Sequence, residues 1–278
     1  MDSEAELITN SISVLIPVLN GEQFIGQALD SVLVQPLASE ILVVDNGSSD
    51  GTLEILNNYI TKDSRVRVLH CTERGVSKAL NVGLALANGS LIARLDADDK
   101  MSPERLEYQL RVMQEHPEVA LVSSQIIFIN SEDIEIGRSN YPSGKLTLLR
   151  NFIFRNPVAH PSVMFRKEIV ELAGNYRSEF EGAEDLDLWI RILNLGDIFS
   201  SEEFLTYYRV HENQVTVKNN LYDTEFTLRL KCLKEFYRGP IKRSIFSILQ
   251  LMRIVDLLLM RFSAVALLRK SFKARIKR

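Results

Sequence analysis

The sequence is poor in cysteine, with only Cys71 and Cys232 among its 278 residues. Two cysteines cannot form a disulfide framework, and this pair lacks the close spacing of metal ligands. The sequence also lacks the basic start and apolar core of a secretory signal peptide, because it opens with Met-Asp-Ser-Glu-Ala-Glu. A protein of the reducing cytoplasm is therefore expected.

Two familiar nucleotide-binding loops are missing as well. The chain contains no Gly-x-x-x-x-Gly-Lys-Ser/Thr loop and no Gly-x-Gly-x-x-Gly turn. The first holds the phosphates of ATP in many ATPases, and the second holds the diphosphate of dinucleotide cofactors. Their absence argues against ordinary ATPases and against dinucleotide-dependent enzymes.

No apolar run is long enough to cross a membrane. In the most hydrophobic region, residues 244–268, the longest stretch without a charge is the nine residues from Ser244 to Met252. A transmembrane helix needs about 18 or more. The sequence therefore predicts no transmembrane helix here.

Charge is unevenly distributed. The net charge is −3, but residues 238–278 contain eleven Lys or Arg and the single acid Asp256, so the rest of the chain carries −13. Such an acidic body is not expected to bind nucleic acid. Two interpretations remain open for residues 240–278. They form helices that pack on the catalytic domain or on a second subunit of a homo-oligomer, or they lie peripherally on the anionic inner face of a membrane.

Apolar β-branched runs alternate with helical segments in the first half, a pattern typical of βαβ units around a mostly parallel sheet flanked by helices. The predicted strands are 12–16, 41–44, 66–69 and 91–95, with further strands at 119–129 and 205–210. The predicted helices are 22–34, 53–59 and 77–87, with later ones from 102 to 115 and from Glu184. We expect one α/β domain over residues 1–217 and a basic, amphipathic helical extension over 218–278.

Segments that contain polar residues end three of the predicted strands. These segments are Pro17-Val18-Leu19-Asn20, Asp45-Asn46-Gly47 and Asp96-Ala97-Asp98-Asp99. In open parallel sheets ligands bind at the carboxyl ends of the strands, where these loops meet. The three segments are therefore candidates for a nucleotide site.

The pair Asp96 and Asp98 suits a divalent cation. Magnesium and manganese are usually bound by one or two carboxylates together with substrate phosphates. With one residue between them, the two acids can bring one carboxylate to the metal and the other to a ribose or a water. The alternative is an acidic turn that merely caps the helix starting near Ser102.

Several further motifs occur in a fixed order along the chain. They are Ser13-Val14-Leu15-Ile16-Pro17, Val43-Val44-Asp45-Asn46-Gly47-Ser48-Ser49-Asp50-Gly51-Thr52, Gly75-Val76-Ser77-Lys78-Ala79-Leu80-Asn81, Asp96-Ala97-Asp98-Asp99, His160-Pro161-Ser162-Val163-Met164-Phe165-Arg166, Glu184-Asp185-Leu186-Asp187-Leu188-Trp189 and Tyr208-Arg209-Val210-His211. Over residues 11–217 this ordered set resembles the inverting family 2 glycosyltransferases of the GT-A fold, enzymes of bacterial polysaccharide and related glycan synthesis. The resemblance implies sugar transfer from a nucleotide-sugar donor to a glycan, lipid-linked or other hydroxyl acceptor.

The resemblance also implies donor-side roles. Asp45 would hydrogen-bond the base, commonly uracil, in a pocket lined by the backbone around Pro17. Asp96 would lie near the ribose and the metal, and Asp98 would bind the Mn²⁺ or Mg²⁺ that bridges the diphosphate. Lys78 would approach the phosphates. His211 would complete the binding of the metal or the diphosphate. Leu19 stands where the family often has an aromatic residue, so base stacking is not expected there.

On the acceptor side, inversion needs one base that takes the acceptor proton. Glu184 and Asp185 are the candidates, and the family pattern favours Asp185. His160 would order the acceptor-side loop. The plain alternative is that both acids only complement the dipole of the helix they begin.

Two other functions compete with glycosyl transfer. A nucleotidyltransferase would also use acids and magnesium on an α/β sheet, but the loop from Pro17 to Glu22 lacks the lysine or arginine that would hold a triphosphate. A non-catalytic module that binds sugar nucleotides should have lost either the acids that bind the metal or the acid that serves as catalytic base. The chain retains candidates for both.

Overall fold

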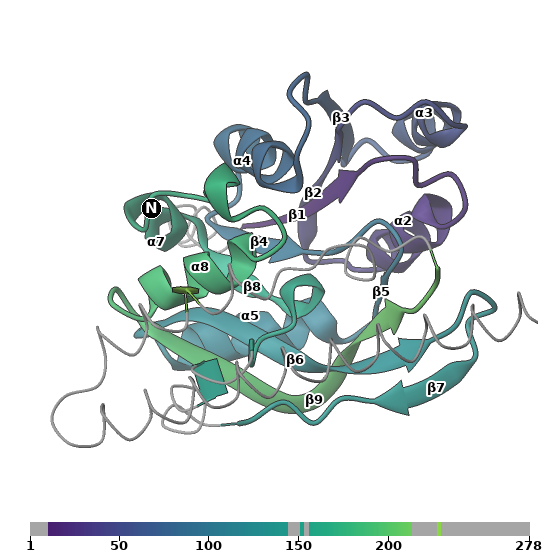
Figure 1. The fold of residues 1–278 in the computed structure, drawn as a ribbon. Coiled ribbons are helices and arrows are strands. Elements are labelled where there is room, and N and C mark those ends of the chain that lie inside the picture. The colour runs from purple at the N-terminus through teal and green to yellow at the C-terminus, as the bar shows by residue number, and fades with distance from the viewer. Residues whose placement is uncertain (1–10, 144–150, 153–155, 213–226, 229–278) are drawn as a thin grey trace, which may run out of the picture. The chain divides into compact units, whose positions relative to one another are not determined.

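The computed structural model describes residues 11–143, 151–152, 156–212 and 227–228. The chain divides into two compact units, Met1–Glu225 and Phe226–Arg278, and almost all of the second lies outside the described residues. The predicted extension over 218–278 and its basic tail stay predictions for this reason. The first unit is shown in Figure 1. Within the described ranges, no helix has both the length and the hydrophobicity to cross a membrane.

Four parallel strands build the first half, in the order β3-β2-β1-β4. The strands are β1 (Ile12–Val18), β2 (Ala38–Asp45), β3 (Val66–His70) and β4 (Leu91–Arg94). The helices that connect them are α2 (Ile25–Leu33), α3 (Thr52–Lys62) and α4 (Val76–Leu86). The predicted parallel sheet of βαβ units is confirmed in this half, with strand and helix bounds shifted by a few residues.

Beyond β4 the sheet becomes mixed. The next strands in the sheet are β8 (Met164–Arg166), β6 (Val119–Ile129), β9 (Asp197–Arg209) and β5 (Lys100–Met101), and β7 (Glu135–Arg138) pairs with β6. Strand β8 is antiparallel to β4 and β6, whereas β9 runs parallel to β6 and antiparallel to β5. The remaining described elements are α5 (Arg105–Glu115), α7 (Lys167–Leu172), α8 (Glu184–Ile192) and the 3₁₀ turns η1 (His160–Ser162) and η2 (Ser178–Phe180). The long strands β6 and β9 curve side by side away from the parallel half (Figure 1).

Helices cover both faces of the parallel half, which explains its uninterrupted apolar strands. Val14 and Ile16 of β1 pack in one buried cluster with Leu29 of α2. Leu15 points to the other face, where α4 approaches so closely that a Cβ atom at Gly83 would lie 2.1 Å from a methyl group of Leu15. Glycine at position 83 therefore allows α4 to pack directly on the sheet.

The loops after β1 and β2 are joined at one edge of the sheet. The backbone amide of Asn20 donates to Ser48 Oγ at 2.9 Å, and the amide of Gly21 donates to Thr52 Oγ1 at 2.8 Å. The amide of Asn46 donates to the carbonyl of Val18 at 2.8 Å. These bonds fix the loops at the carboxyl ends of the parallel strands, the edge at which a ligand site is expected.

Candidate active site

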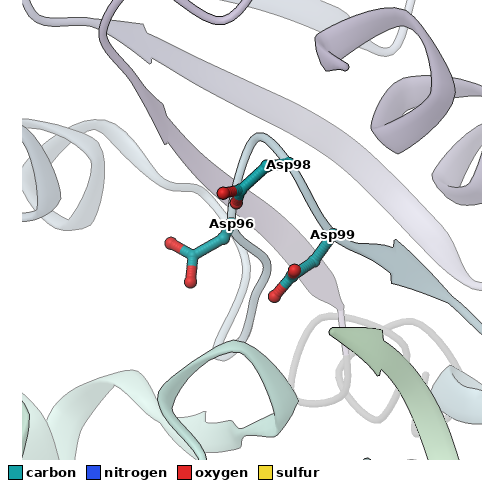
Figure 2. Close-up of side chains that lie close together, drawn as sticks. All are labelled: Asp96, Asp98 and Asp99. Carbon is teal, nitrogen blue, oxygen red and sulfur yellow. The ribbon is translucent and has the colours of Figure 1, made fainter. Parts of the chain in front are cut away.

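Three carboxylates cluster where the chain turns from β4 into β5. One oxygen from each of Asp96, Asp98 and Asp99 lies within 4.8 Å of the others, and Figure 2 shows the three side chains grouped around this turn. Asp99 is only 1% exposed, while Asp96 and Asp98 are partly exposed. Asp96 and Asp98, predicted from the sequence, are thus brought together, and the structure adds Asp99 to them.

Each carboxylate of the cluster is held by a basic residue. The guanidinium of Arg94 forms two hydrogen bonds to Asp96, one of them at 2.6 Å. His211 Nε2 lies 2.9 Å from Asp98 Oδ2, so the predicted histidine does reach the acidic loop. The backbone amide of Arg209 donates to Asp99 Oδ1 at 2.8 Å, and Asp99 Oδ2 is buried with no hydrogen-bond partner among the described residues.

The cluster is electrostatically costly without a cation. Burial raises the pKa of Asp99 well above its usual range, and the charges of Asp96 and Asp98 raise it further. Burial also raises the pKa of Asp96, where the charge of Arg94 opposes the effect and that of Asp98 adds to it. A divalent cation would relieve both the repulsion and the unpaired oxygen of Asp99. The donor set, all carboxylate oxygens with one imidazole nearby, fits Mn²⁺ or Mg²⁺.

The alternative interpretation of this loop, an acidic cap for the following helix, is wrong. Strand β5 separates the acids from α5, which begins at Arg105 and has no side-chain cap hydrogen bond. Asp99 is the acid nearest to α5 in the sequence, and it instead accepts a hydrogen bond from the backbone amide of Arg209 at the end of β9. Asp98 and Asp99 thus contact His211 and Arg209 at the end of β9, and Asp96 contacts Arg94 of β4.

Asp45 lies at the end of β2 and is 3% exposed. Its carboxylate accepts hydrogen bonds from the backbone amides of Gly47 at 3.2 Å and Ser48 at 3.1 Å, and Oδ2 lies 3.7 Å from His70 Nδ1. Pro17 is buried in β1 opposite Val44. The two predicted base-pocket residues therefore lie on adjacent strands at the same edge of the sheet, and their contacts with a nucleobase stay a prediction.

Asn20 and Lys78 make local contacts in the structure. Asn20 has a positive φ of 54°, and its Oδ1 accepts the backbone amide of Ser49 at 2.8 Å, so it organises the two loops. Lys78, on α4, places its Nζ 2.6 Å from Glu73 Oε2, and this hydrogen bond raises the lysine pKa. Lys78 would have to leave Glu73 in order to reach a phosphate.

Glu184 and Asp185 begin α8, as predicted, but their surroundings differ. Asp185 is half-buried, and its Oδ2 accepts a hydrogen bond from Asn156 Nδ2 at 2.7 Å. Glu184 is buried, accepts the backbone amide of Gly182 at 2.5 Å and lies 3.8 Å from His160 Nδ1. Burial, with the charge of Asp185 adding to it, raises the pKa of Glu184 to about 7. Asp185 is thus the more accessible carboxylate of the two.

His160 is buried beside the start of α8. Its Nε2 lies 2.9 Å from the Tyr176 hydroxyl, and burial followed by the charge of Arg94 holds its pKa well below the usual range. The pKa of Tyr176 is raised, first by burial, while its charged neighbours act in both directions: Arg94 lowers it, and Asp185, Glu184 and Asp96 raise it. Arg94 itself binds Asp96 of the acidic loop, whereas His160 lies 3.8 Å from Glu184 at the start of α8.

Four residues of this site were not predicted as site residues. Asp99 stood inside the acidic motif, and Arg94 was visible as a charged residue within an apolar strand. Such a charge must find a partner when the strand is buried, and this was the available signal. Arg209 likewise stood as a charge within the predicted strand 205–210 and inside one of the family motifs, whereas Tyr176 gave no comparable signal.

Glu184→Gln is expected to flatten the dependence of stability on pH. An unfolded glutamate has a pKa of 4.5, and in the folded protein the pKa of Glu184 is about 7. The folded state therefore binds more protons between these values, and its stability falls as the pH rises through them, by roughly 3 kcal/mol. The variant should lack this fall. Urea unfolding followed by the fluorescence of Trp189, the single tryptophan, at pH 5 and pH 8 measures it, and equal slopes in both proteins would contradict it.

Comparison with known proteins agrees with these features. The family model for glycosyl transferase family 2 matches residues 13–172. The O-antigen biosynthesis glycosyltransferase WbnJ of Escherichia coli is 31% identical over 256 residues, which cover 84% of this chain and 98% of that protein. The crystal structure of S. aureus TarS in complex with UDP-GlcNAc is similar with a TM-score of 0.70, at 20% identity over 86% of this chain and 71% of that one. A mannosyltransferase of Pyrobaculum calidifontis in complex with GDP-Man and Mn²⁺ gives a TM-score of 0.62, at 18% identity over 84% and 66%.

Proposed function

The chain belongs to glycosyl transferase family 2 and has its GT-A fold, and from this premise we propose a metal-dependent, inverting transfer of a sugar from a nucleotide-sugar donor to a hydroxyl acceptor. The observation that supports it best is the cluster of Asp96, Asp98 and Asp99 at the carboxyl end of β4. Its position suits a donor diphosphate, since ligands of such sheets bind at this edge.

In this proposal Asp98, Asp99 and Asp96 hold the cation, with His211 beside Asp98. When bound, Mn²⁺ or Mg²⁺ supplies positive charge to the leaving diphosphate. Arg94 holds Asp96 in place through its two hydrogen bonds, so that Asp96 can face the ribose with a fixed orientation. The buried, unpartnered oxygen of Asp99 supports a metal at this position.

UDP is the nucleotide proposed for the donor. Asp45 would bind the base, with Pro17 as the wall of its pocket, while Asn20 keeps the two loops together. Lys78 would leave its contact with Glu73 and bind a phosphate of the donor instead. The fold by itself leaves the base open, because TarS was crystallised with UDP-GlcNAc and the similar mannosyltransferase with GDP-Man.

Asp185 is the proposed base that accepts the proton of the attacking hydroxyl. It is more exposed than Glu184, and Asn156 fixes one of its oxygens. Glu184 and His160 would position the start of α8 through their buried contacts. Burial, followed by the charge of Arg94, lowers the pKa of His160 and makes its imidazole a weak proton acceptor, which supports a carboxylate as the base.

The proposed acceptor is a glycan or a lipid-linked saccharide of a bacterial surface polysaccharide, in line with the named role of WbnJ in O-antigen biosynthesis. We propose a cytoplasmic enzyme whose residues 240–278 contact either the inner face of the membrane or a second subunit. Those residues lie outside the described part of the chain, and this element of the proposal depends on their sequence alone.

A panel of UDP- and GDP-sugars, each with and without Mn²⁺, tests the proposal. We expect UDP-sugars with Mn²⁺ to raise the melting temperature, because a ligand at 100 times its Kd adds about 2.7 kcal/mol of stability. We also expect UDP release that increases when acceptor saccharides are added. Stabilisation without any release would indicate a binding module. Formation of a UDP-sugar from UTP and a sugar phosphate would indicate a nucleotidyltransferase.

A further inference from the structure

Arg209, the last residue of β9, is fully buried and contacts three separate segments of the chain: the acidic loop, α2 and the β6–β7 turn. Its Nε donates to the carbonyl of Asp98 at 2.9 Å, and its NH1 donates to the carbonyl of Asn130 at 2.9 Å. Its NH2 lies 2.7 Å from both Gln27 Oε1 and Asp133 Oδ1. All three guanidinium nitrogens are thus hydrogen-bonded, which uses the fixed planar geometry that lysine lacks.

Two of the contacts of Arg209 act directly on the acidic loop. The side chain binds the backbone carbonyl of Asp98, and the backbone amide binds Asp99 Oδ1. Arg209 therefore holds two consecutive residues of the loop at once. The bond to Oδ1 leaves Asp99 Oδ2, which is buried and has no partner among the described residues, as a ligand oxygen.

His211 lies close to Arg209 at the same end of β9. His211 follows Arg209 by two residues and reaches Asp98 Oδ2 at 2.9 Å. The Phe24 ring contacts both: the Arg209 guanidinium lies 4.5 Å from its centroid, and the His211 ring centroid lies 5.1 Å away. Arg209 and Phe24 thus fix the end of β9 against the acidic loop.

Asp133 supplies the charge that a buried guanidinium requires. It lies in the turn between β6 and β7 with a φ of 65°, and its carboxylate contacts both Arg209 and Lys100. The pKa of Asp133 is lowered because the hydrogen bonds from Arg209 and Lys100 outweigh its partial burial. The β6–β7 turn is therefore connected to the acidic loop through Arg209.

We propose that Arg209 and Asp133 are positioning residues of the cation site, which hold Asp98, Asp99 and His211 in the arrangement that binds one divalent cation. This inference rests on the proposed metal dependence. Outer contacts that orient metal ligands typically change metal affinity by about 10- to 100-fold when they are removed. A purely structural role would instead lower stability and leave the affinity for the cation unchanged.

The test is Mn²⁺ binding in the presence of UDP, measured from the electron paramagnetic resonance signal of free Mn²⁺. We expect the Kd for Mn²⁺ to rise about 100-fold in Arg209→Lys and about 10-fold in Asp133→Gly. Glycine adopts a positive φ without strain, so the second variant keeps the turn and remains informative if the first fails to fold. At saturating Mn²⁺, Asp133→Gly should recover most of the wild-type turnover.

Glu132→Gln is the matched control. It removes an exposed carboxylate from the same turn, and it should leave the Kd for Mn²⁺ at the wild-type value. A folded Asp133→Gly variant with unchanged Mn²⁺ affinity and a lower melting temperature would overturn the inference while leaving the metal proposal intact. A wild-type protein that binds UDP but no Mn²⁺ would overturn the proposed metal dependence and this inference together.

Discussion

Asp98→Asn is expected to reduce sugar transfer by about 100- to 1000-fold while the protein stays folded. The change removes one charge from the proposed cation site and keeps the shape of the side chain. A bound metal contributes several kcal/mol to stabilising charge in the transition state, and each 1.36 kcal/mol corresponds to a tenfold change in rate. Stability should change little, or increase slightly, because Asp98 repels the buried Asp99 and so raises its pKa.

Transfer rates across a Mn²⁺ titration measure this effect, together with the melting temperature of the purified variant. Asp30→Asn serves as the control, because it removes the same charge from an exposed position on α2, where the carboxylate contacts Lys62 and the Tyr59 hydroxyl. Its turnover should match the wild type. Near-normal turnover of Asp98→Asn at low Mn²⁺ would show that this carboxylate is not a metal ligand.

Asp185→Asn should lower kcat by about 10²- to 10⁴-fold, the usual effect of removing a general base. Donor affinity should not change, because the proposed base acts on the acceptor, whereas the proposed donor diphosphate would lie at the acidic loop. Asparagine can keep the contact with Asn156, so the start of α8 should retain its structure.

Calorimetry with UDP and Mn²⁺, combined with steady-state kinetics in the acceptor, separates the two sides of the site. A matching loss of nucleotide affinity would move Asp185 to the donor side. Glu184→Gln is the neighbouring comparison, and we expect it to retain more activity, since Glu184 is buried against Gly182 and His160. A loss of turnover in Glu184→Gln alone would assign the base to Glu184.

The sequence determined the parallel half of the fold and the location of the candidate site. The apolar runs of β1 and β2 are local patterns in the sequence, and their alternation with helical segments is the pattern of βαβ units. The acids after β4 follow from the same logic, because the carboxyl ends of parallel strands must meet at one edge. Asp96 and Asp98 could therefore be chosen from their position in the chain, without knowledge of any distant contact.

The second half of the fold was harder to predict from the sequence, and the reason is physical. Strand β5 has only two residues, too short for any periodic pattern. Strand β9 starts at Asp197 and runs through polar residues such as Ser201 and Glu202, whereas the sequence predicted a strand only over 205–210. Pairing with the long strand β6 stabilises this polar stretch, so tertiary contacts override its local preference.

Only the tertiary structure decided how the acidic loop is held. Arg209 lies 111 residues from Asp98, and Asp133 comes from a hairpin turn between them. The ladder between β6 and β9 and the short pairing of β5 with β9 bring these segments together. No local pattern encodes such contacts, because hydrogen-bond partners of a buried guanidinium are chosen by the packing of distant strands and not by neighbours in the chain. The sequence thus identified the candidate ligands of the proposed cation, and the packing of β9 against the acidic loop decided which residues contact them.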